Sequence, residues 1–509
     1  MPAGIAAVTV KENSARRVIR YAPDGSPAVY LKIFKRIGGL RSIISTFRAS
    51  NARREFETLR TLEANGIPVP RTLGAFERRE GNRLLESGLL TEALPEGMSG
   101  EEVLRRERDP EVRRVLLQMM GLLVERLAEL RFVNEDMHAG NLHFVALTRP
   151  DYDMYLLDVH RARYLRSRTE PWRAFDEMLP FFYNSLARVT SRLERIRFLR
   201  NLVGRVSVRW ILEASRRVGE RHHRSRNKRC FTNSSRYAVE RTEARTVYRL
   251  REFPAEALEA VLKSHEESIR GKNAGVFKAL PDRVVTRQAV ETAGSGPEAP
   301  PTRRWVVGVK EFRYHPLRAA FHGLMRSPGM RAWFNGAGLE VRHVPTPRPL
   351  AFVVGWDGRE RLVTDWVEGA FPLNDFLKRL FVPQCPVELR REFVRRLARE
   401  VRRLHLVAGI DHGDLKANNI LVGMDGTIRF LDLDRVRFRG VVPMARRMKA
   451  LAQLNAAVTP PVTKTDRLFF LACYAVYETG LWHHRKETVW EIMDMTKARK
   501  HLWPEAKGG

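Results

Sequence analysis

Two short segments of the chain contain acidic and amide side chains at the same spacing. In each, an Asp is followed five positions later by an Asn, and a second Asp comes after an apolar stretch. The residues are Asp136, Asn141 and Asp158 in the first segment and Asp414, Asn419 and Asp432 in the second. Phosphoryl transfer needs this combination, because one carboxylate accepts the proton of the attacking hydroxyl while an amide and another carboxylate hold Mg²⁺ against the nucleotide phosphates.

A lysine on a distant strand completes such a site, because its ammonium group binds the α- and β-phosphates. Lys32 and Lys310 each lie in a run of β-branched and apolar residues that predicts a strand. Thr91 and Thr364, on a later predicted strand, are candidates for the position behind the adenine. Each residue type also has an ordinary structural role, since Asp and Asn bond local backbone in turns and Lys and Thr are common on strands. The recurrence of the whole set favours the functional interpretation.

The two sets belong to a longer internal repeat. Six pairs of segments match in the same order along the chain. The clearest pairs are "AVYLKIFKR" with "WVVGVKEFR", "NGIPVPRTLGAF" with "RHVPTPRPLAF", and "DMHAGNL" with "DLKANNI". Lys310 follows Lys32 by 278 residues, and Asp414 follows Asp136 by the same number. We infer a duplicated domain.

Each copy has the same order of predicted elements. A β-rich start is followed by a helical segment that ends before a Pro-x-Pro turn, since proline stops a helix. A strand then precedes a long amphipathic helix, "VRRVLLQMMGLLVERLAEL" in the first copy and "RREFVRRLAREVRRLHLV" in the second. That helix leads to the polar loop and a short hairpin. We predict domains at 1–215 and 246–509, separated by a basic linker at 216–245, because "RRVGERHHRSRNKR" contains few core residues.

Composition places the chain among globular proteins with more than one domain. It has 509 residues, of which 44% are hydrophobic and 29% charged. Its longest apolar stretch, "LFFLACYAVY", is about half of the roughly 20 residues that span a bilayer, and no signal segment is expected at the start. The 3 cysteines are far apart and lack C-x-x-C spacing. They indicate reduced thiols in the cytoplasm and argue against a disulfide framework or a zinc site.

The charge balance is strongly positive. The chain has 90 Lys and Arg residues against 59 Asp and Glu residues, a net charge of +31. A field of this sign attracts nucleic acid, anionic membrane surfaces and phosphorylated lipids. Charge alone does not choose among these partners, and solvated, Arg-rich helix surfaces explain it equally well.

The segment "HGDLKANNIL…FLDLDR" resembles the lipopolysaccharide kinase (Kdo/WaaP-type) family, which has a protein-kinase-like fold. "VPTPRPLAFV" and "TDRLFFLACY" are similar to that family too. The resemblance covers most of 270–480, and a weaker one covers roughly 8–200. It implies an α+β fold of two tandem protein-kinase-like domains, each with a small β-rich N-lobe and a larger helical C-lobe. It also implies ATP and Mg²⁺ as cofactors.

The resemblance implies a role for each residue and an acceptor. The assigned base, two metal ligands and phosphate-binding lysine are Asp414, Asn419, Asp432 and Lys310 in the second copy and Asp136, Asn141, Asp158 and Lys32 in the first. Glu55 is the helix carboxylate that holds the lysine of the first copy. The implied acceptor is a sugar hydroxyl of the lipopolysaccharide core or a lipid precursor, reached by peripheral contact at the cytoplasmic face of the inner membrane. Nucleic acid is not an expected partner.

The sequence departs from the family pattern at three points, and the first two distinguish the copies. Ala332 is opposite Glu55 in the repeat, so another acid near that helix is expected to pair with Lys310. Asn134 stands in the place of His412, so the first copy lacks a histidine that braces the loop. Neither copy has G-x-G-x-x-G before its lysine. We expect both copies to bind nucleotide and the second to be the catalyst.

Three other functions remain open from the sequence. A Ser/Thr protein kinase has the same fold, although no A-P-E follows Asp432. A pseudokinase scaffold that binds nucleotide without catalysis accounts for the departures. A nucleic-acid-binding protein is supported only by net charge and Arg clusters.

Overall fold

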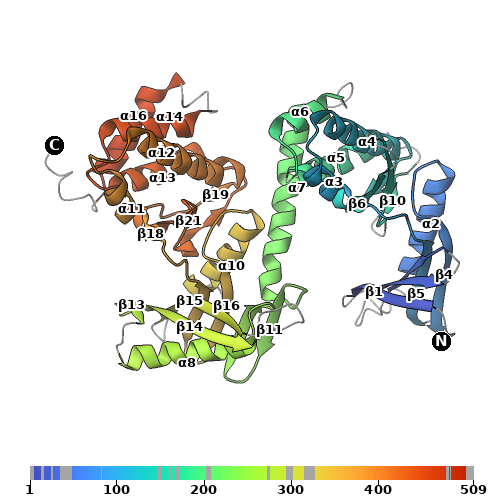
Figure 1. Cartoon of the computed structure of the whole chain (residues 1–509), viewed down its shortest axis with the longest axis horizontal. Coiled ribbons are helices and arrows are strands. Elements are labelled where there is room, and N and C mark those ends of the chain that lie inside the picture. The colour runs from blue at the N-terminus through green and yellow to red at the C-terminus, as the bar shows by residue number, and fades with distance from the viewer. Residues whose placement is uncertain are drawn as a thin grey trace. The chain divides into compact units, whose positions relative to one another are not determined.

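The computed structural model forms two compact units, Met1–Glu220 (unit 1) and Arg221–Gly509 (unit 2). It describes residues 5–12, 16–23, 27–34, 49–81, 83–146, 151–159, 162–166, 172–187, 189–201, 208–271, 275–293, 302–314, 327–476, 481 and 483–499. Each unit combines a β-sheet with a set of helices (Figure 1), which confirms the predicted α+β class. Among the described residues, none of the helices has the length and apolar character that crossing a membrane requires.

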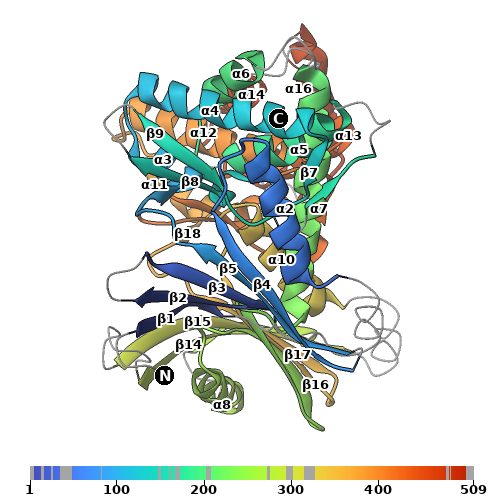
Figure 2. The same cartoon turned by 90° about the vertical axis from the view of Figure 1, so that its right-hand side faces the viewer.

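Unit 1 begins with a five-stranded antiparallel sheet in the order β1-β2-β3-β5-β4. Its strands are β1 (Ile5–Glu12), β2 (Arg16–Pro23), β3 (Val29–Phe34), β4 (Thr72–Glu80) and β5 (Arg83–Glu92). Helix α2 (Asn51–Ala64) packs against β4 and β5 (Figure 2). The helix starts at Ser50, whose hydroxyl accepts a hydrogen bond from the backbone N–H of Arg53. The apolar residues around Lys32 form a strand, as predicted. This strand, β3, is the central one of the sheet.

The larger part of unit 1 is helical. Its helices are α3 (Gly100–Arg106), α4 (Pro110–Glu129), α5 (Trp172–Leu186), α6 (Arg192–Asn201) and the first part of α7 (Val208–Lys228). Its short strands are β6 (Met98–Ser99), β7 (Phe132–Asn134), β8 (Leu142–Ala146), β9 (Tyr152–Leu156) and β10 (Ala162–Tyr164). Helix α4 buries the apolar residues of its predicted face, Leu116, Met120 and Leu127 among them. The polar loop follows this helix, between β7 and β8.

Unit 2 begins with a seven-stranded antiparallel sheet in the order β11-β12-β16-β17-β15-β14-β13. Its strands are β11 (Tyr237–Arg241), β12 (Arg245–Leu250), β13 (Val276–Leu280), β14 (Arg283–Ala293), β15 (Thr302–Arg313), β16 (Pro349–Gly355) and β17 (Arg359–Asp365). Helices α8 (Ala255–Gly271) and α10 (Pro328–Val341) lie on opposite sides of this sheet (Figures 1 and 2).

The second half of unit 2 is again mainly helical. Its helices are α11 (Leu373–Leu380), α12 (Val387–Arg402), α13 (Met444–Ala457), α14 (Lys464–Ala475) and α16 (Arg485–Lys497). Its short strands are β18 (Phe371–Pro372), β19 (Ile410–Asp411), β20 (Ile420–Val422), β21 (Ile428–Phe430) and β22 (Arg437–Phe438). The polar loop lies between β19 and β20, after the long helix α12, so the order of elements matches unit 1.

The strand register shows that the sequence repeat is a structural repeat. Lys32 of β3 is paired with Leu89 of β5, and Lys310 of β15 is paired with Leu362 of β17. Both β4 and β16 have an irregularity at their start, where they pair with β5 and β17. Five strands of unit 2 therefore repeat the whole sheet of unit 1, and the predicted tandem arrangement is confirmed.

Unit 2 extends this common sheet with β11, β12 and helix α8, which precede the repeated strands. Helix α8 is attached to the sheet through buried polar groups. His265 of α8 lies with its Nδ1 2.7 Å from Thr286 Oγ1 and its Nε2 3.5 Å from Glu311 Oε2. Within the sheet, Arg361 Nε donates to Glu311 Oε2 at 3.0 Å. Burial would raise the pKa of Glu311, but hydrogen bonds from His265 and Arg313 and the charge of Arg361 lower it to about 2. This carboxylate therefore stays ionised inside the sheet lobe.

Residues 216–245 differ from the linker that the sequence suggests. They contain the last part of α7, all of β11 and the first residue of β12. The segment lacks a continuous apolar run, but it buries single side chains, including Val218, Asn227, Cys230 and Tyr237. Such isolated buried residues leave little periodic signal in a stretch dominated by Arg, which is why composition suggested a solvated linker.

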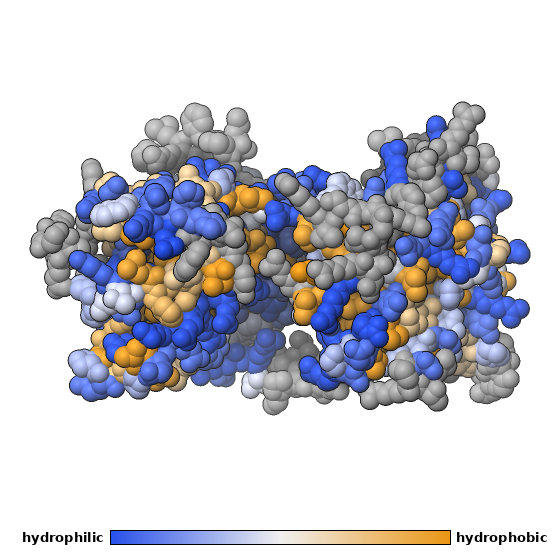
Figure 3. Space-filling view, turned by 90° about the horizontal axis from the view of Figure 1, so that it is seen from above, coloured by the Kyte–Doolittle hydropathy of each residue, from blue (hydrophilic) through white to orange (hydrophobic). Residues whose placement is uncertain are grey.

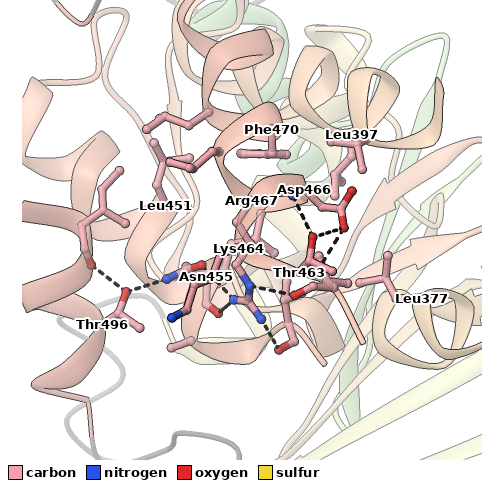
Figure 4. A pocket seen from close by; sticks show the side chains of 18 of the residues that line it. Leu377, Leu397, Leu451, Asn455, Thr463, Lys464, Asp466, Arg467, Phe470 and Thr496 are labelled. Atoms are coloured by element: carbon pink, nitrogen blue, oxygen red, sulfur yellow. Dashed lines mark hydrogen bonds between the residues drawn. The ribbon is translucent and has the colours of Figure 1, made fainter. Parts of the chain in front are cut away.

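A cavity of about 690 Å³ lies among α11, α12, α13, α14 and α16 of unit 2 (Figure 4). Its lining is mainly apolar and includes Leu377, Leu397, Leu451 and Phe470. None of the residues that the sequence predicts for chemistry lines this cavity. The cavity therefore belongs to the helical core and not to the candidate site.

Arg467, at the edge of this cavity, holds the connection between α13 and α14 (Figure 4). Its Nη1 donates to the backbone oxygen of Asn455 at 2.7 Å, and its Nε donates to that of Val462 at 3.2 Å. We expect Arg467→Ala to lower the free energy of unfolding by about 2–4 kcal/mol, because each buried acceptor left without a donor costs about 1–3 kcal/mol. Urea denaturation measures this change. Lys464→Ala, an exposed residue of the same helix, is the control; equal unfolding midpoints would contradict the prediction.

Candidate functional site

Unit 1 brings three of the predicted residues into direct contact. Lys32 Nζ lies 2.7 Å from Glu55 Oε1 and 3.1 Å from Asp158 Oδ1. Glu55 is only 4% exposed, so its carboxylate depends on Lys32 for charge compensation. The sheet supplies the lysine, helix α2 supplies the glutamate and the segment after β9 supplies the aspartate. Residues more than a hundred positions apart thus form one ion-pair cluster.

The backbone geometry explains how Asp158 reaches this cluster. Its φ angle is 54°, in the left-handed region that non-glycine residues rarely adopt. The turn is held from two sides: Asn134 Nδ2 donates to the backbone oxygen of Asp158 at 3.3 Å, and Leu157 N donates to that of Asn141 at 2.8 Å. Asp432 has the same conformation, with φ at 57°. Both units therefore turn the chain in the same uncommon way at the second aspartate.

The polar loop of unit 1 is ordered by two amides. Asn141 Nδ2 donates to the backbone oxygen of Asp136 at 2.9 Å, and Asp136 N donates to Asn134 Oδ1 at 3.0 Å. Asn134 therefore braces both the loop and the turn at Asp158, in the place where unit 2 has His412. The Asp136 side chain is 41% exposed, and the imidazole Nε2 of His138 lies 3.9 Å from its carboxylate.

The equivalent loop of unit 2 holds its aspartate more firmly. Asn419 Nδ2 donates to the backbone oxygen of Asp414 at 2.9 Å and to its carboxylate at 3.2 Å. Lys416 Nζ lies 2.9 Å from the same carboxylate, which is 17% exposed. Gln453 of α13 accepts a hydrogen bond from Leu415 N at 2.9 Å, so a helix supports the loop from behind.

The lysine of unit 2 is paired differently from that of unit 1. Lys310 Nζ lies 2.6 Å from Asp432 Oδ1, and among the described residues this is its one salt bridge. Ala332, 3% exposed, occupies the place of Glu55 on the equivalent helix. Glu340 of this helix pairs with Arg236 and Arg348 and not with Lys310, so it is not the expected replacement acid. Asn335 of the same helix donates to the backbone oxygen of Leu433 at 2.6 Å.

Electrostatics favour the ionised form of the second aspartate. Burial would raise the pKa of Asp432, but the charge and hydrogen bond of Lys310 outweigh it, with help from Arg283 and Lys416, and the pKa lies below its usual range. Burial and the neighbouring Asp432 raise the pKa of Asp434. The ionised form is therefore favoured at Asp432 and disfavoured at Asp434, and Asp432 is the carboxylate suited to bind a cation.

The two threonines lie on the strand beside each lysine strand. Thr91 of β5 is paired with Tyr30, and Thr364 of β17 is paired with Gly308. Each partner is two residues before the lysine, so in each unit the threonine and the lysine lie on the same side of their sheet. In unit 2, Trp366 packs close to Gly308, where a Cβ atom would lie 3.2 Å from its ring.

The donor set of each unit fits a magnesium–nucleotide complex. Among the described residues no group of three or more His, Cys, Asp or Glu side chains gathers as a metal site. Each unit instead offers one aspartate that contacts the lysine and one asparagine in the polar loop. The backbone oxygen of that asparagine accepts a hydrogen bond at 2.8 Å from the residue before the aspartate. Mg²⁺ is commonly bound by one or two carboxylates together with substrate phosphates, so a sparse protein donor set is the one expected. Asn141 with Asp158, and Asn419 with Asp432, are the residues suited to hold it.

Three residues of this region were not identified from sequence. Arg16 forms a two-pronged ion pair with Asp158, and Lys416 contacts Asp414. Gln453 supports the loop from 38 positions away. Arg16 had a signal, because "VKENSARRVIR" and "FKALPDRVVTR" share that arginine. Gln453 had none, since a glutamine on a helix gives no local indication of its partner.

Comparison with known proteins shows the family of the chain. The model of the lipopolysaccharide kinase (Kdo/WaaP) family matches residues 7–193 and 320–474, more than half of the chain. Lys310 lies outside the matched segments. The search of solved structures gives "WaaP in complex with acyl carrier protein", at 20% identity and a TM-score of 0.34, covering 43% of this chain and 89% of that one. No curated protein matches the chain.

Proposed function

Because the chain belongs to the lipopolysaccharide kinase (Kdo/WaaP) family, we propose that it transfers the γ-phosphoryl group of ATP, with Mg²⁺, to a sugar hydroxyl of the lipopolysaccharide core. The observation that supports this most is the contact of a strand lysine with the second aspartate in both units, at 3.1 Å and 2.6 Å. This pair lies beside a loop that holds an aspartate and an asparagine. Those are the groups that position a triphosphate and an attacking hydroxyl.

The roles follow from the chemistry of each side chain. Asp414 accepts the proton of the sugar hydroxyl, and Lys416 and Asn419 orient its carboxylate. Lys310 binds phosphate oxygens, while Asn419 and Asp432 hold the metal. Mg²⁺, when bound, offsets the negative charge of the phosphates. Asp136, Lys32, Asn141 and Asp158 occupy the same positions in unit 1.

We assign the chemical step to unit 2 and nucleotide binding to both units. Asp414 is held by a lysine and an amide, whereas Asp136 is more exposed and has no lysine within its loop. Unit 1, however, has the complete Lys32–Glu55 pair that unit 2 lacks. A second candidate function therefore applies to unit 1 only: it is a scaffold that binds nucleotide without catalysis.

The surface charge is compatible with an anionic acceptor at a membrane. The net charge is +31, and much of the described surface seen in Figure 3 is hydrophilic. Lipopolysaccharide core and phospholipid headgroups are anionic, so they are drawn to such a surface without a spanning helix. We propose peripheral contact with the cytoplasmic face of the inner membrane.

Product analysis tests the acceptor. The purified chain is incubated with Mg²⁺ and γ-labelled ATP, together with deacylated core oligosaccharide, complete lipopolysaccharide or a generic protein substrate. We expect label in the sugar portion of the core, located by mild hydrolysis and mass spectrometry. Transfer to protein with none to either saccharide would support a protein kinase. Absence of transfer to all three, in a chain that binds ATP, would support a pseudokinase.

A further inference from the structure

Arg16 links the first hairpin of unit 1 to the second aspartate. It is the first residue of β2, the strand that pairs with β1. Its Nη1 and Nη2 atoms each lie 3.1 Å from Asp158 Oδ2, and Nη1 lies 3.3 Å from Oδ1. Lys32 Nζ donates to the same Oδ1 at 3.1 Å. Both carboxylate oxygens of Asp158 are therefore occupied by cationic donors.

The four groups joined by these ion pairs carry equal numbers of positive and negative charges. Lys32 and Arg16 are two cations, and Glu55 and Asp158 are two anions, in a cluster whose side chains are at most 20% exposed. A magnesium complex of a nucleoside triphosphate is a net anion, and its metal needs Asp158. If Asp158 held the metal, its ion pair with Arg16 would open, and the guanidinium would be able to bind phosphate oxygens. A guanidinium binds phosphate oxygens with the same two-pronged geometry that it uses for carboxylate.

Unit 2 has an arginine at the same place. Arg283 is the first residue of β14, and it matches Arg16 in the repeated segments "VKENSARRVIR" and "FKALPDRVVTR". Its Nη2 donates to Asp282 at 3.0 Å. Burial and Lys310 have the largest effects on the pKa of Asp432. The charge of Arg283 comes next and helps to lower that pKa. Arg283 has the same place in the strand register as Arg16, because Val285 is paired with Lys310 as Val18 is paired with Lys32. Its side chain pairs with Asp282 of its own turn.

The hairpins that carry these arginines contain no glycine. Their sequences are "VKENSARRV" and "FKALPDRVV". Backbone N–H groups of a glycine-rich loop cover the phosphates in protein kinases, because glycine allows the close approach. These two hairpins replace that close backbone approach with a long cationic side chain that reaches the site from the same edge of the sheet.

We propose that Arg16 and Arg283 are phosphate-binding residues that move from the metal-binding aspartate to the triphosphate when nucleotide binds. The proposal rests on the proposed function, because it takes ATP as the ligand. It differs from an inhibitory role, in which the arginine only competes with the metal. The two roles have opposite consequences: removing a phosphate ligand weakens ATP binding, whereas removing a competitor strengthens it.

Nucleotide binding by arginine variants tests the proposal. Arg16→Ala is measured in a Lys310→Met background and Arg283→Ala in a Lys32→Met background. The background substitution weakens nucleotide binding by the other unit, so that the affinity of one unit is measured at a time. Isothermal titration gives dissociation constants for Mg-ATP and for adenosine. We expect each variant to weaken Mg-ATP binding about tenfold or more, the loss of one charge-assisted phosphate contact, and to leave adenosine binding unchanged. The controls are Arg17→Ala and Arg359→Ala, which remove exposed arginines paired with Glu12 and Asp357.

Each other outcome has a definite meaning. Unchanged or tighter Mg-ATP binding in both arginine variants would overturn the proposal while leaving the kinase function intact. No binding of Mg-ATP by either background or by the unaltered chain would instead defeat the proposed function. If Arg16→Ala unfolds, Arg16→Lys is measured in its place, because lysine keeps the charge but not the two-pronged geometry. We expect this variant to lose part of its affinity for Mg-ATP and none of its affinity for adenosine. Equal losses for ATP and adenosine in that variant would show a merely structural arginine.

Discussion

Asp414→Asn is expected to lower the kcat of phosphoryl transfer about 10²–10⁴-fold, the usual contribution of a positioned general base. Asparagine keeps the shape of the side chain and its hydrogen bond with Asn419, but it does not accept a proton. The carboxylate is held by Lys416 at 2.9 Å and by Asn419 at 3.2 Å, so the change removes a group already aligned for the reaction. Initial rates with saturating Mg-ATP and core oligosaccharide measure it.

The same substitution in unit 1 is the matched control for this result. Asp136→Asn alters the equivalent loop position, where the side chain is more exposed and lacks the lysine contact. We expect a small change in kcat, because unit 1 is assigned to nucleotide binding. A large loss in Asp136→Asn together with normal turnover in Asp414→Asn would assign the chemical step to unit 1. Large losses in both would mean that each unit performs a necessary transfer.

Asp432→Asn is expected to reduce kcat/KM by about 100-fold or more and to raise the Mg²⁺ concentration needed for half-maximal rate. A bound metal stabilises the transferring phosphoryl group by several kcal/mol, and about 1.4 kcal/mol corresponds to a tenfold change in rate. Lys310 and the other nearby cations keep this carboxylate ionised and ready to bind a metal. Rates measured over a Mg²⁺ titration test both parts of the prediction.

Asp425→Asn is a suitable control for the loss of an acidic side chain from the same hairpin, because Asp425 is 60% exposed and lies in the turn between β20 and β21. An unchanged Mg²⁺ dependence in Asp432→Asn would contradict the assignment of Asp432 as a metal ligand. A loss of activity that excess Mg²⁺ fully restores would instead confirm that the residue acts on metal affinity alone.

The long helices and the strands of each repeat were predictable because their side chains have a clear period. The amphipathic pattern before each polar loop becomes α4 and α12, and the apolar run around each lysine becomes β3 and β15. The short spacing from Asp to Asn also survives in the structure, since Asn141 and Asn419 each bond the backbone of the aspartate five positions earlier. Local spacing and periodicity were sufficient for these features.

The amino-acid sequence by itself determined the duplication and the two sets of polar residues, because each depends on local period or a repeated spacing, and the α+β class followed from its resemblance to a known family. Tertiary structure decided which side chains meet. Arg16 reaches Asp158 across 142 positions, and Lys310 pairs with Asp432 where the helix carries only Ala332. Neither contact leaves a local trace, because the direction of a side chain across a folded site depends on how distant strands, turns and helices pack together.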